Sequence, residues 1–584
     1  MSQKPRWMTG VIALIAALML LAAACGNDDD GVETGTTTEQ PSDASGDSSD
    51  DSGDDASDGG DAGASDDAGD AGGADDAGDT AGDDGGDAAA PDDGDSGDDD
   101  AADAAPPAPT GTLVVGRAAD VDVLDPHLAT AFQSVQALEM VYDTLLSLGP
   151  DLAVGPGLAE SWEFSDDGLT LTMHLREGVA FHGGDSFDSE DAAASLNRIL
   201  DEETGAVTRA NIASIASVDT PDSSTVVLNL SQPDAPILAS LADLNAAMVS
   251  ADAIAAGTVD TDPDGTGPFA WSDWQQGQAV TLTANVDHWR GSPQVGSVEI
   301  RVLPDESSLL AAVDVGEVNV AVITDPLVAV LAGDDVEVLR TPALAYHALM
   351  MNSNRGPLAD QSVRWAISCA IDRQGVVDSA ALGEGAVTGP ITIPAYQSST
   401  DGLPCGGQRD VAEAERLLAE AGQGDGFELN VIVPTFYASA VNEAQVIQAQ
   451  LGDVGIDLDL EVLETDVYVD RWLAADFDAA VALNSGKIDP HQMYVRYWTS
   501  DGNLNAIASY SSDTLDELMA AGRVETDQAA RVEIYADFSE ALQEASPWIW
   551  IYHGFEYRIL NGVENFTPMP TGSLQYLREA TLVG

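Results

Sequence analysis

The chain has 584 residues, which is long enough for several domains. Its 101 acidic side chains far outnumber its 21 Lys and Arg residues, so the formal net charge is −80. A field of that sign repels nucleic acids and anionic lipid surfaces, and we therefore expect no nucleic-acid partner.

Residues 1–25 have the parts of a bacterial export signal. Two basic residues precede an apolar run at 11–21, which is short for a membrane span. The segment ends in Ala-Ala-Ala-Cys-Gly, which resembles the lipobox of bacterial lipoproteins, where the cysteine is lipidated and becomes the mature N-terminus. We expect a lipid on Cys25, with an ordinary secretory signal cut near Ala24 as the alternative.

Residues 26–110 are of low complexity. They consist mainly of Asp, Gly, Ala and Ser, with 29 acidic residues, no basic residue and no aromatic residue. Such a segment has too little apolar surface to offset the entropy of ordering, and its like charges repel one another. We expect a disordered, extended tether, on the order of 50 Å or more in mean span, that holds a binding domain away from the membrane.

The folded part is predicted to begin with a strand at 111–116, followed by a helix at 134–146. Leu138, Leu145 and Leu146 recur on this helix at helical spacing, which indicates one face in a core. Further strands are predicted at 225–230, 269–274, 279–284 and 298–302, and a further helix at 306–313.

The stretch 158–200 combines a turn, a strand and a helix. Residues 158–162 are predicted to end a loop, and apolar and polar side chains then alternate over 169–175, as in a half-buried strand. Ser189 is the predicted N-cap of the helix that follows, with acidic residues in its first turn.

The residues of this stretch carry a family resemblance. The sequence LAESWEFSDDGLTLTMHLREGVAFHGGDSFDSEDAAASL closely resembles the signature of family 5 extracytoplasmic solute-binding proteins of ABC importers. The resemblance implies an α/β fold of the two-lobe, periplasmic-binding-protein-like kind, with an extra small subdomain in the first lobe and hinge strands between the lobes. It also implies a monomer that captures a small-molecule or peptide ligand between its lobes and delivers it to an ABC permease and ATPase complex.

The resemblance divides the chain into segments. The expected boundaries are the signal peptide 1–25, the tether 26–110, the first part of lobe 1 at 111–152, the extra subdomain at 153–261, lobe 1 continued at 262–344, lobe 2 at 345–546, and crossover strands with a return to lobe 1 at 547–584.

Predicted strands and helices alternate in the second lobe. The strands are expected at 346–351, 427–433 and 456–462, and the helices at 361–371, 410–421, 444–451 and 468–473. This alternation favours an α/β lobe with a largely parallel sheet. Two strands at 548–552 and 556–560 are predicted to cross back between the lobes.

The loop at 484–491 is the most informative part of the expected cleft. Peptide-binding members of the family place an Asp a few residues before an Asp-Pro pair, where it binds the ligand's α-ammonium group. Alignment on Asp489-Pro490 puts Gly486 at that position, which puts ordinary peptide recognition in doubt. Its neighbour Lys487 is the only lysine after the signal peptide. We hypothesise that Lys487 pairs with an anionic group of the ligand; a surface charge is the alternative.

The same loop suggests a second hypothesis. Its Asp-Pro-His sequence resembles the nickel-binding branch of the family, in which the histidine helps to hold a chelated metal. His491 is thus an alternative metal ligand, against a structural histidine at a helix start. The full set of expected ligand-binding residues is Phe132, Gln133, Ser134, Tyr346, Ser485, Gly486, Lys487, Asp489, Tyr497 and Trp498. Core packing is the alternative for the aromatic members of the second lobe.

Cys369 and Cys405 form an even pair in a chain that is expected to be exported. We expect a disulfide between them, with two buried free thiols as the alternative. The expected location is extracytoplasmic, with a lipid anchor on the outer face of the cytoplasmic membrane.

The sequence has no G-x-S-x-G, H-E-x-x-H, P-loop or C-x-x-C motif, and its seven histidines are scattered. We therefore expect neither an enzyme nor a cofactor. A binding lipoprotein that reports its ligand to a sensor, without transport, is the alternative outside the importer class.

Overall fold

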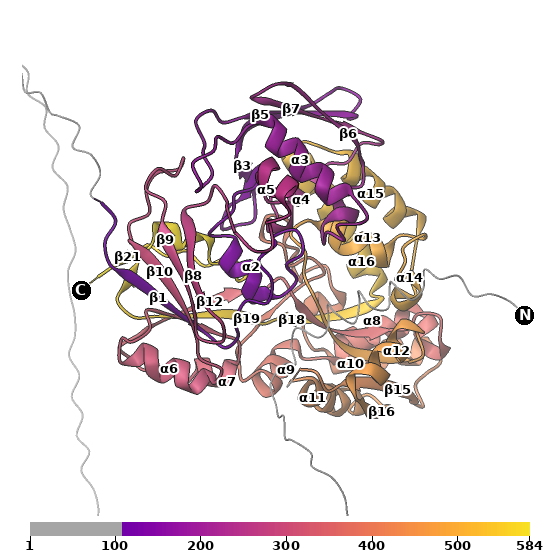
Figure 1. Ribbon diagram of the computed structural model, residues 1–584. Coiled ribbons are helices and arrows are strands. Elements are labelled where there is room, and N and C mark those ends of the chain that lie inside the picture. The colour runs from indigo at the N-terminus through magenta and orange to yellow at the C-terminus, as the bar shows by residue number, and fades with distance from the viewer. Residues whose placement is uncertain (1–107, 438, 584) are drawn as a thin grey trace, which may run out of the picture. The chain divides into compact units, whose positions relative to one another are not determined.

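The computed structural model describes residues 108–437 and 439–583 (Figure 1). The expected signal peptide, the lipidation site at Cys25 and the tether up to residue 107 lie outside these described residues. Within the described part, no helix combines the length and the apolar character that crossing a membrane requires.

A seven-stranded sheet forms the first main layer of structure. Its strand order is β12-β19-β11-β1-β10-β9-β8. The strands are β1 (Thr112–Arg117), β8 (Phe269–Gln275), β9 (Ala279–Ala284), β10 (Ser297–Val302), β11 (Val320–Ile323), β12 (Glu337–Pro342) and β19 (Phe555–Leu560). Strand β1 is parallel to both β10 and β11, and the outer pairs are antiparallel. Leu113 and Val115 of β1 are fully buried, because a central strand has both faces covered.

A four-stranded antiparallel sheet contains the family-like stretch. Its order is β4-β5-β7-β6, with β4 (Ala159–Phe164), β5 (Thr170–Leu175), β6 (Ile215–Asp222) and β7 (Thr225–Leu230). Helix α3 (Ser189–Leu200) lies beside these strands in Figure 1 and shares their apolar core. The predicted strand at 169–175 is confirmed as β5.

Two details of this sheet correct the sequence analysis. Residues 159–162 are part of strand β4 rather than a loop, because they pair with β5. The N-cap of α3 is Asp188 rather than Ser189. The Asp188 carboxylate accepts from the Glu190 N–H, and the Asp191 carboxylate accepts in return from the Asp188 N–H, which completes a capping box.

The helix predicted at 134–146 is also corrected. Helix α2 covers only Phe132–Leu138, and the chain then turns into the short antiparallel pair β2 (Leu146–Leu148) and β3 (Val154–Pro156). The helix ends early because the backbone carbonyl groups of the next residues form hydrogen bonds with a distant segment. The carbonyl groups of Met140 and Val141 accept hydrogen bonds from the N–H groups of Phe269 and Gly267.

A six-stranded sheet forms the second main layer, in the order β14-β18-β13-β17-β15-β16. Its strands are β13 (Tyr346–Met351), β14 (Ala386–Val387), β15 (Phe427–Pro434), β16 (Ile456–Leu463), β17 (Ala479–Asn484) and β18 (Trp548–His553). The prediction of a largely parallel sheet is wrong. Strands β17, β15 and β16 run parallel to one another, whereas β13 is antiparallel to both β17 and β18, and β14 is antiparallel to β18. Alternation of strands and helices along a chain does not report where a later strand such as β18 inserts.

Helices and short strands complete the described part. They are α4 (Ile237–Ser240), α5 (Ala251–Ala256), α6 (Glu306–Asp314), α7 (Pro326–Ala329), α8 (Gln361–Ala370), α9 (Arg373–Ala380), α10 (Val411–Glu420), α11 (Ala440–Gly452), α12 (Thr465–Leu473), α13 (Pro490–Trp498), α14 (Asn505–Ala508), α15 (Asp513–Val524), α16 (Gln528–Ala545), β20 (Val563–Glu564) and β21 (Thr581–Leu582). A disulfide joins Cys369 of α8 to Cys405, whose Cα atoms lie 5.5 Å apart.

Two chain segments pass from one large sheet to the other. Strand β12 of the seven-stranded sheet leads into β13 of the six-stranded sheet, and β18 leads back into β19 through Gly554 alone (Figure 1). The segments are hydrogen-bonded to each other where they cross. The Ala343 N–H donates to the Gly554 carbonyl over 2.9 Å, and Nδ1 of His553 lies 3.0 Å from the Ala343 carbonyl. The predicted crossover strands are therefore confirmed.

Candidate functional site

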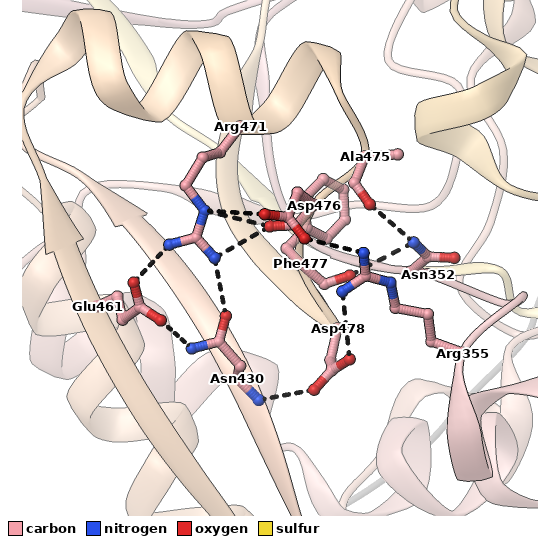
Figure 2. A network of polar contacts seen from close by, with 9 residues as sticks. All are labelled: Asn352, Arg355, Asn430, Glu461, Arg471, Ala475, Asp476, Phe477 and Asp478. Atoms are coloured by element: carbon pink, nitrogen blue, oxygen red, sulfur yellow. Dashed lines mark hydrogen bonds and ion pairs between the residues drawn. The ribbon is translucent and has the colours of Figure 1, made fainter.

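A polar network surrounds the start of β17, the strand that leads into the loop at 484–491. Figure 2 shows the polar network around the start of β17. Arg471 bonds to Glu461 and to the Asn430 side chain, and the Asn430 N–H donates to the Asp478 carboxylate over 2.9 Å. Arg355 pairs with the same carboxylate over 3.8 Å. Most of these groups are partly exposed, so their role is to hold the strand's start rather than to add much stability.

At its other end, β17 brings two expected site residues together. The Asn484 side chain donates to the Tyr346 hydroxyl over 2.8 Å and accepts from the Tyr497 hydroxyl over 3.2 Å. All three side chains are buried, and burial raises the pKa of both tyrosines, so their hydroxyls stay neutral. Asn484 was not among the expected residues, although it begins the loop that was singled out.

Trp498 is fully buried in an aromatic cluster. Its ring lies 4.7 Å from that of Trp548 and 6.2 Å from that of Trp550, both on β18. Tyr497 packs on the same Trp548 ring at 5.2 Å. Core packing therefore accounts for the position of Trp498, while Tyr497 also belongs to the Asn484 network.

Both carboxylate oxygens of Asp489 are engaged by protein groups. One oxygen accepts from the His491 N–H over 2.8 Å as the N-cap of α13, and the two oxygens meet Arg531 over 2.8 and 3.1 Å. Arg531 also donates to the Gly522 carbonyl and the Tyr396 hydroxyl. Asp489 therefore fixes the start of α13, and nothing in its contacts requires a ligand.

His491 lies at the start of α13 and is also buried. Burial lowers the pKa of its imidazole to about 4, against the opposing effect of the Asp489 charge, so the ring is neutral near pH 7. Within residues 108–437 and 439–583, no group of three or more His, Cys, Asp and Glu side chains is arranged to hold a metal ion.

Gly486 has no room for a side chain. A Cβ atom built on it would lie 2.1 Å from the Cβ atom of Leu344 and 2.6 Å from the Leu344 carbonyl carbon. Real Cβ contacts are never that short, so any substitution has to displace the Leu344 backbone. The position that aligns with the ammonium-binding Asp of peptide-binding members is therefore closed by the crossover segment.

Lys487 is half-buried, and its ammonium group takes part in none of the hydrogen bonds or ion pairs found among the described residues. Burial lowers its pKa, the Asp243 charge raises it, and the Arg496 charge lowers it again. Asp243 accepts from the Asn245 N–H over 2.9 Å, and burial raises its pKa. Lys487 therefore has a second cation, Arg496, near it as well as the acid Asp243, within a chain that is strongly acidic as a whole.

Arg496 contributes the second cation from α13. Its guanidinium group lies 4.8 Å from the ring centroid of Tyr497, a cation–π contact, and its buried Nε has no hydrogen-bond partner among the residues described. Its charge acts on both Lys487 and Tyr346. Lys487, Arg496, Tyr346 and Tyr497 thus form one neighbourhood, while Ser485 is exposed at its edge.

The opposing acid comes from a distant segment. Asp243 follows α4, in the segment after the four-stranded sheet, whereas Lys487 lies in the loop after β17 of the six-stranded sheet. The same two regions meet at a second point, where the Gln492 amide donates to the Ser240 hydroxyl over 2.6 Å. The cationic neighbourhood therefore lies where the two lobes face each other.

The expected first-lobe residues lie together on α2. Ser134 is fully buried, and its hydroxyl donates to the Asp122 carboxylate over 2.6 Å and accepts from the Asp122 N–H over 2.9 Å. The Gln133 carbonyl accepts from Arg117, and the side chains of Phe132 and Gln133 stay half-exposed. Ser134 thus fixes the loop before α2. Arg117 was missed, because an arginine at a strand end has no sequence signal of its own.

Two surface hollows lie away from these residues. One of about 440 Å³ is lined by α9 and α11 residues, including Ser379 and Gln445, and one of about 300 Å³ lies beside β12 and β20. None of the expected ligand-binding residues lines either hollow.

Residues 153–506 match the family model described as bacterial extracellular solute-binding proteins, family 5 middle. This match covers well over half of the chain. The chain belongs to this family.

Related proteins and structures agree with the family match. The glutathione-binding protein GsiB of Salmonella paratyphi A is 28% identical over 462 residues, which cover 75% of this chain and 88% of GsiB. The structure of HbpA2 from Haemophilus parasuis is 26% identical, with a TM-score of 0.74, over 81% of this chain and 100% of HbpA2. The periplasmic binding protein DppA of Helicobacter pylori, in complex with the peptide STSA, is 25% identical with a TM-score of 0.63 over 81% and 98% of the two chains.

Membership settles the class of this family 5 protein. It is an extracytoplasmic solute-binding protein of an ABC importer and not an enzyme. Its two large sheets, joined by two crossing segments, are the two-lobe α/β architecture of the family, and its four-stranded sheet is the additional subdomain.

Proposed function

We propose that this family 5 protein captures a small, peptide-like solute that carries an anionic group, and delivers it to an ABC permease and ATPase complex as a lipid-anchored component. The observation that carries the ligand assignment is the cationic neighbourhood of Lys487 and Arg496. Lys487 and Arg496 are both half-buried in a chain of net charge −80, and the one acid whose charge acts on Lys487 among the described residues is Asp243. Burial of a cation without a close partner is unfavourable, and an anionic ligand group would relieve that cost.

The closure of Gly486 supports the same ligand class. A ligand bound mainly through an α-ammonium group needs a carboxylate, and the position where peptide-binding members supply it has no space for one. The second lobe instead offers an ammonium and a guanidinium group. A glutathione-binding relative and a peptide-bound relative are consistent with this proposal, because peptides carry carboxylates as well as amines.

The lipid anchor and the tether rest on the sequence alone. The lipobox-like end of the signal peptide supports lipidation of Cys25, and the acidic segment after it supports a spacer between the membrane and the binding lobes. Metabolic labelling with a palmitate analogue tests the anchor. Label on the wild-type protein that is absent from Cys25→Ser is expected, and an unlabelled, secreted wild-type protein would rule the anchor out.

A thermal-shift screen of the full chain tests the ligand class. The probes are glutathione, the peptide STSA, the C-terminal amide of that peptide, and nickel–histidine. A probe at 100 times its dissociation constant stabilises the folded state by about 2.7 kcal/mol, which is a measurable shift. We expect a shift with at least one free-acid probe, and a much smaller one in Lys487→Met.

The matched control is Arg355→Met, which removes a cation at the far end of β17, in the network of Figure 2. It should leave the ligand-induced shift unchanged. An equal shift in wild type and Lys487→Met would show that Lys487 is only a surface charge. A shift with nickel–histidine alone, lost in His491→Ala, would replace this proposal with the nickel-chelate alternative.

A further inference from the structure

Five arginine side chains in the described part are almost completely buried. They are Arg117, Arg364, Arg373, Arg531 and Arg558, each with 5% or less of its surface exposed. Four of them have no buried nitrogen without a partner. Arg531 meets a carboxylate, for example, and Arg373 donates to three carbonyl groups and the Ser368 hydroxyl. Arg117 is the exception, because its Nε and Nη2 atoms are buried without a hydrogen-bond partner.

Arg117 is oriented so that one edge of its guanidinium group has no hydrogen-bond partner. Its Nη1 donates to the Gln133 carbonyl of α2, which fixes the orientation of the group. The Nε and Nη2 atoms lie on the opposite edge, and together they form the two parallel donors that match the two oxygens of a carboxylate. Burying two such donors without acceptors is unfavourable, and acceptors supplied by a ligand would remove that cost.

Among the described residues, no acidic side chain accepts a hydrogen bond from Nε or Nη2 of Arg117. Asp120 acts on Arg117 through its charge, but its carboxylate accepts from Trp274 Nε1 and from the backbone N–H groups of Val121 and Gly277. Arg117 forms no ion pair in the described part of the chain. Burial lowers the pKa of Arg117 to about 10, so the group still carries its charge near neutral pH.

Arg117 lies at the edge of the sheet where ligands of α/β proteins usually bind. Arg117 is the last residue of β1, which is parallel to β10 and β11, and ligands of α/β sheets bind beyond the carboxyl ends of such strands. Residues 118–131, which follow, lead into α2 with its expected ligand residues. Gln136 lies one turn after Gln133 on α2. Its side-chain Oε1 is also buried without a hydrogen-bond partner.

We infer that Arg117 is an anion-binding residue of the first lobe, which holds a carboxylate of the captured solute through Nε and Nη2. This inference rests on the proposed function and adds to it. It assigns the ligand a carboxylate on the first-lobe side, independent of the Lys487 neighbourhood, and therefore favours solutes with two anionic groups. Gln136 Oε1 would accept from an N–H or hydroxyl group of the same solute.

Three variants of the full chain test the inference. Arg117→Met removes the charge at similar length, Arg117→Lys keeps the charge but not the two parallel donors, and Arg373→Met is the control for loss of a buried arginine whose donors are all used. The melting temperature is measured without ligand and with glutathione, STSA or citrate. We expect Arg117→Met to melt at or above the wild-type temperature without ligand, and Arg373→Met to melt several degrees lower.

The ligand series completes the test. Whichever probe stabilises the wild type should bind at least 30-fold more weakly to both Arg117 variants. A ligand-free melting temperature that falls as in Arg373→Met, or an unchanged affinity in Arg117→Met, would overturn the inference. A wild type that none of the three probes stabilises would contradict the proposed function, and the ligand-free melting temperature of Arg117→Met would then decide the inference by itself.

Discussion

The position of a Cβ atom on Gly486 lies 2.1 Å from the Cβ atom of Leu344, so the loop after β17 is in direct contact with the segment that crosses between the lobes. We predict that Gly486→Ala lowers the free energy of unfolding by about 1–3 kcal/mol, the usual cost of overpacking. Urea unfolding followed by circular dichroism measures it.

Gly452, at the end of α11, is the control for this prediction, since nothing lies within 4 Å of its Cβ position. Gly452→Ala should be neutral or stabilising by about 0.5–1 kcal/mol, because Ala loses less backbone entropy in a helix. A Gly486→Ala protein as stable as Gly452→Ala would show that the Leu344 contact relaxes freely. Gly486→Asp should likewise fail to create a peptide site.

The buried pair of Asp489 and Arg531 is predicted to be a major structural contact. Arg531→Met leaves the Asp489 carboxylate buried without its cation, which costs about 3–5 kcal/mol when one partner of a buried pair is removed. Denaturant unfolding of the variant should show this loss. The control is Arg416→Met, because Arg416 is exposed on α10, and this variant should unfold at the wild-type denaturant concentration. An equally small effect of Arg531→Met would mean that the Asp489 carboxylate does not need Arg531 and is available to a ligand.

The buried histidines predict a dependence of stability on pH. Burial lowers the pKa of His491 and of His127 to about 4, below the unfolded value of 6.5. Below pH 6.5 the unfolded chain therefore binds protons that the folded chain does not, so stability falls as the pH drops from 6.5 to 4. Each histidine contributes a slope of about 1.4 kcal/mol per pH unit in this window. Burial raises the pKa of Glu139 to about 7, and this carboxyl group opposes the trend between pH 7 and 4.5.

Melting temperatures measured from pH 4 to pH 7.5 test this prediction. The His491→Gln variant should have a flatter profile than the wild type over the window, whatever its stability at pH 7.5. The control is His174→Gln, because His174 is exposed on β5. Parallel profiles of wild type and His491→Gln would mean that His491 is protonated in the folded protein.

The disulfide between Cys369 and Cys405 is predicted to stabilise the second lobe. It closes a loop of 36 residues, which corresponds to about 3–4 kcal/mol in the chain-entropy model. Unfolding with and without a reductant measures the difference. The double variant Cys369→Ser/Cys405→Ser should unfold like the reduced wild type, and reductant should have no effect on it. An insensitive wild type would contradict a structural disulfide.

Local patterns in the sequence were sufficient for many elements. The strands Tyr346–Met351 and Ala279–Ala284 have the predicted bounds, because each is a regular apolar run or alternation ended by a polar residue or turn. Asp360 and Asp410 cap α8 and α10 as expected of acidic residues before an apolar helix.

The errors come from contacts between distant segments. Helix α2 stops at Leu138, because the next carbonyl groups pair with residues near Phe269, and no local pattern contains that information. The antiparallel pairing of β13 with β17 and β18 depends on which distant strands become its neighbours. The candidate site also depends on contacts that local sequence patterns do not contain. The stretch around Lys487 could be found from the family resemblance, but the closure of Gly486 by Leu344 depends on tertiary packing.

The most direct test of the central claim is the affinity of wild type and Lys487→Met for a pair of ligands that differ by one carboxylate. Isothermal titration calorimetry with the peptide STSA and its C-terminal amide provides the pair, with glutathione and its ethyl ester as the second. We predict that the wild type binds one of the free acids at least tenfold more tightly than its uncharged form, and that this ratio falls toward one in Lys487→Met. An equal ratio in both proteins, or a preference of the wild type for the uncharged forms, would contradict capture of an anionic solute by this lobe.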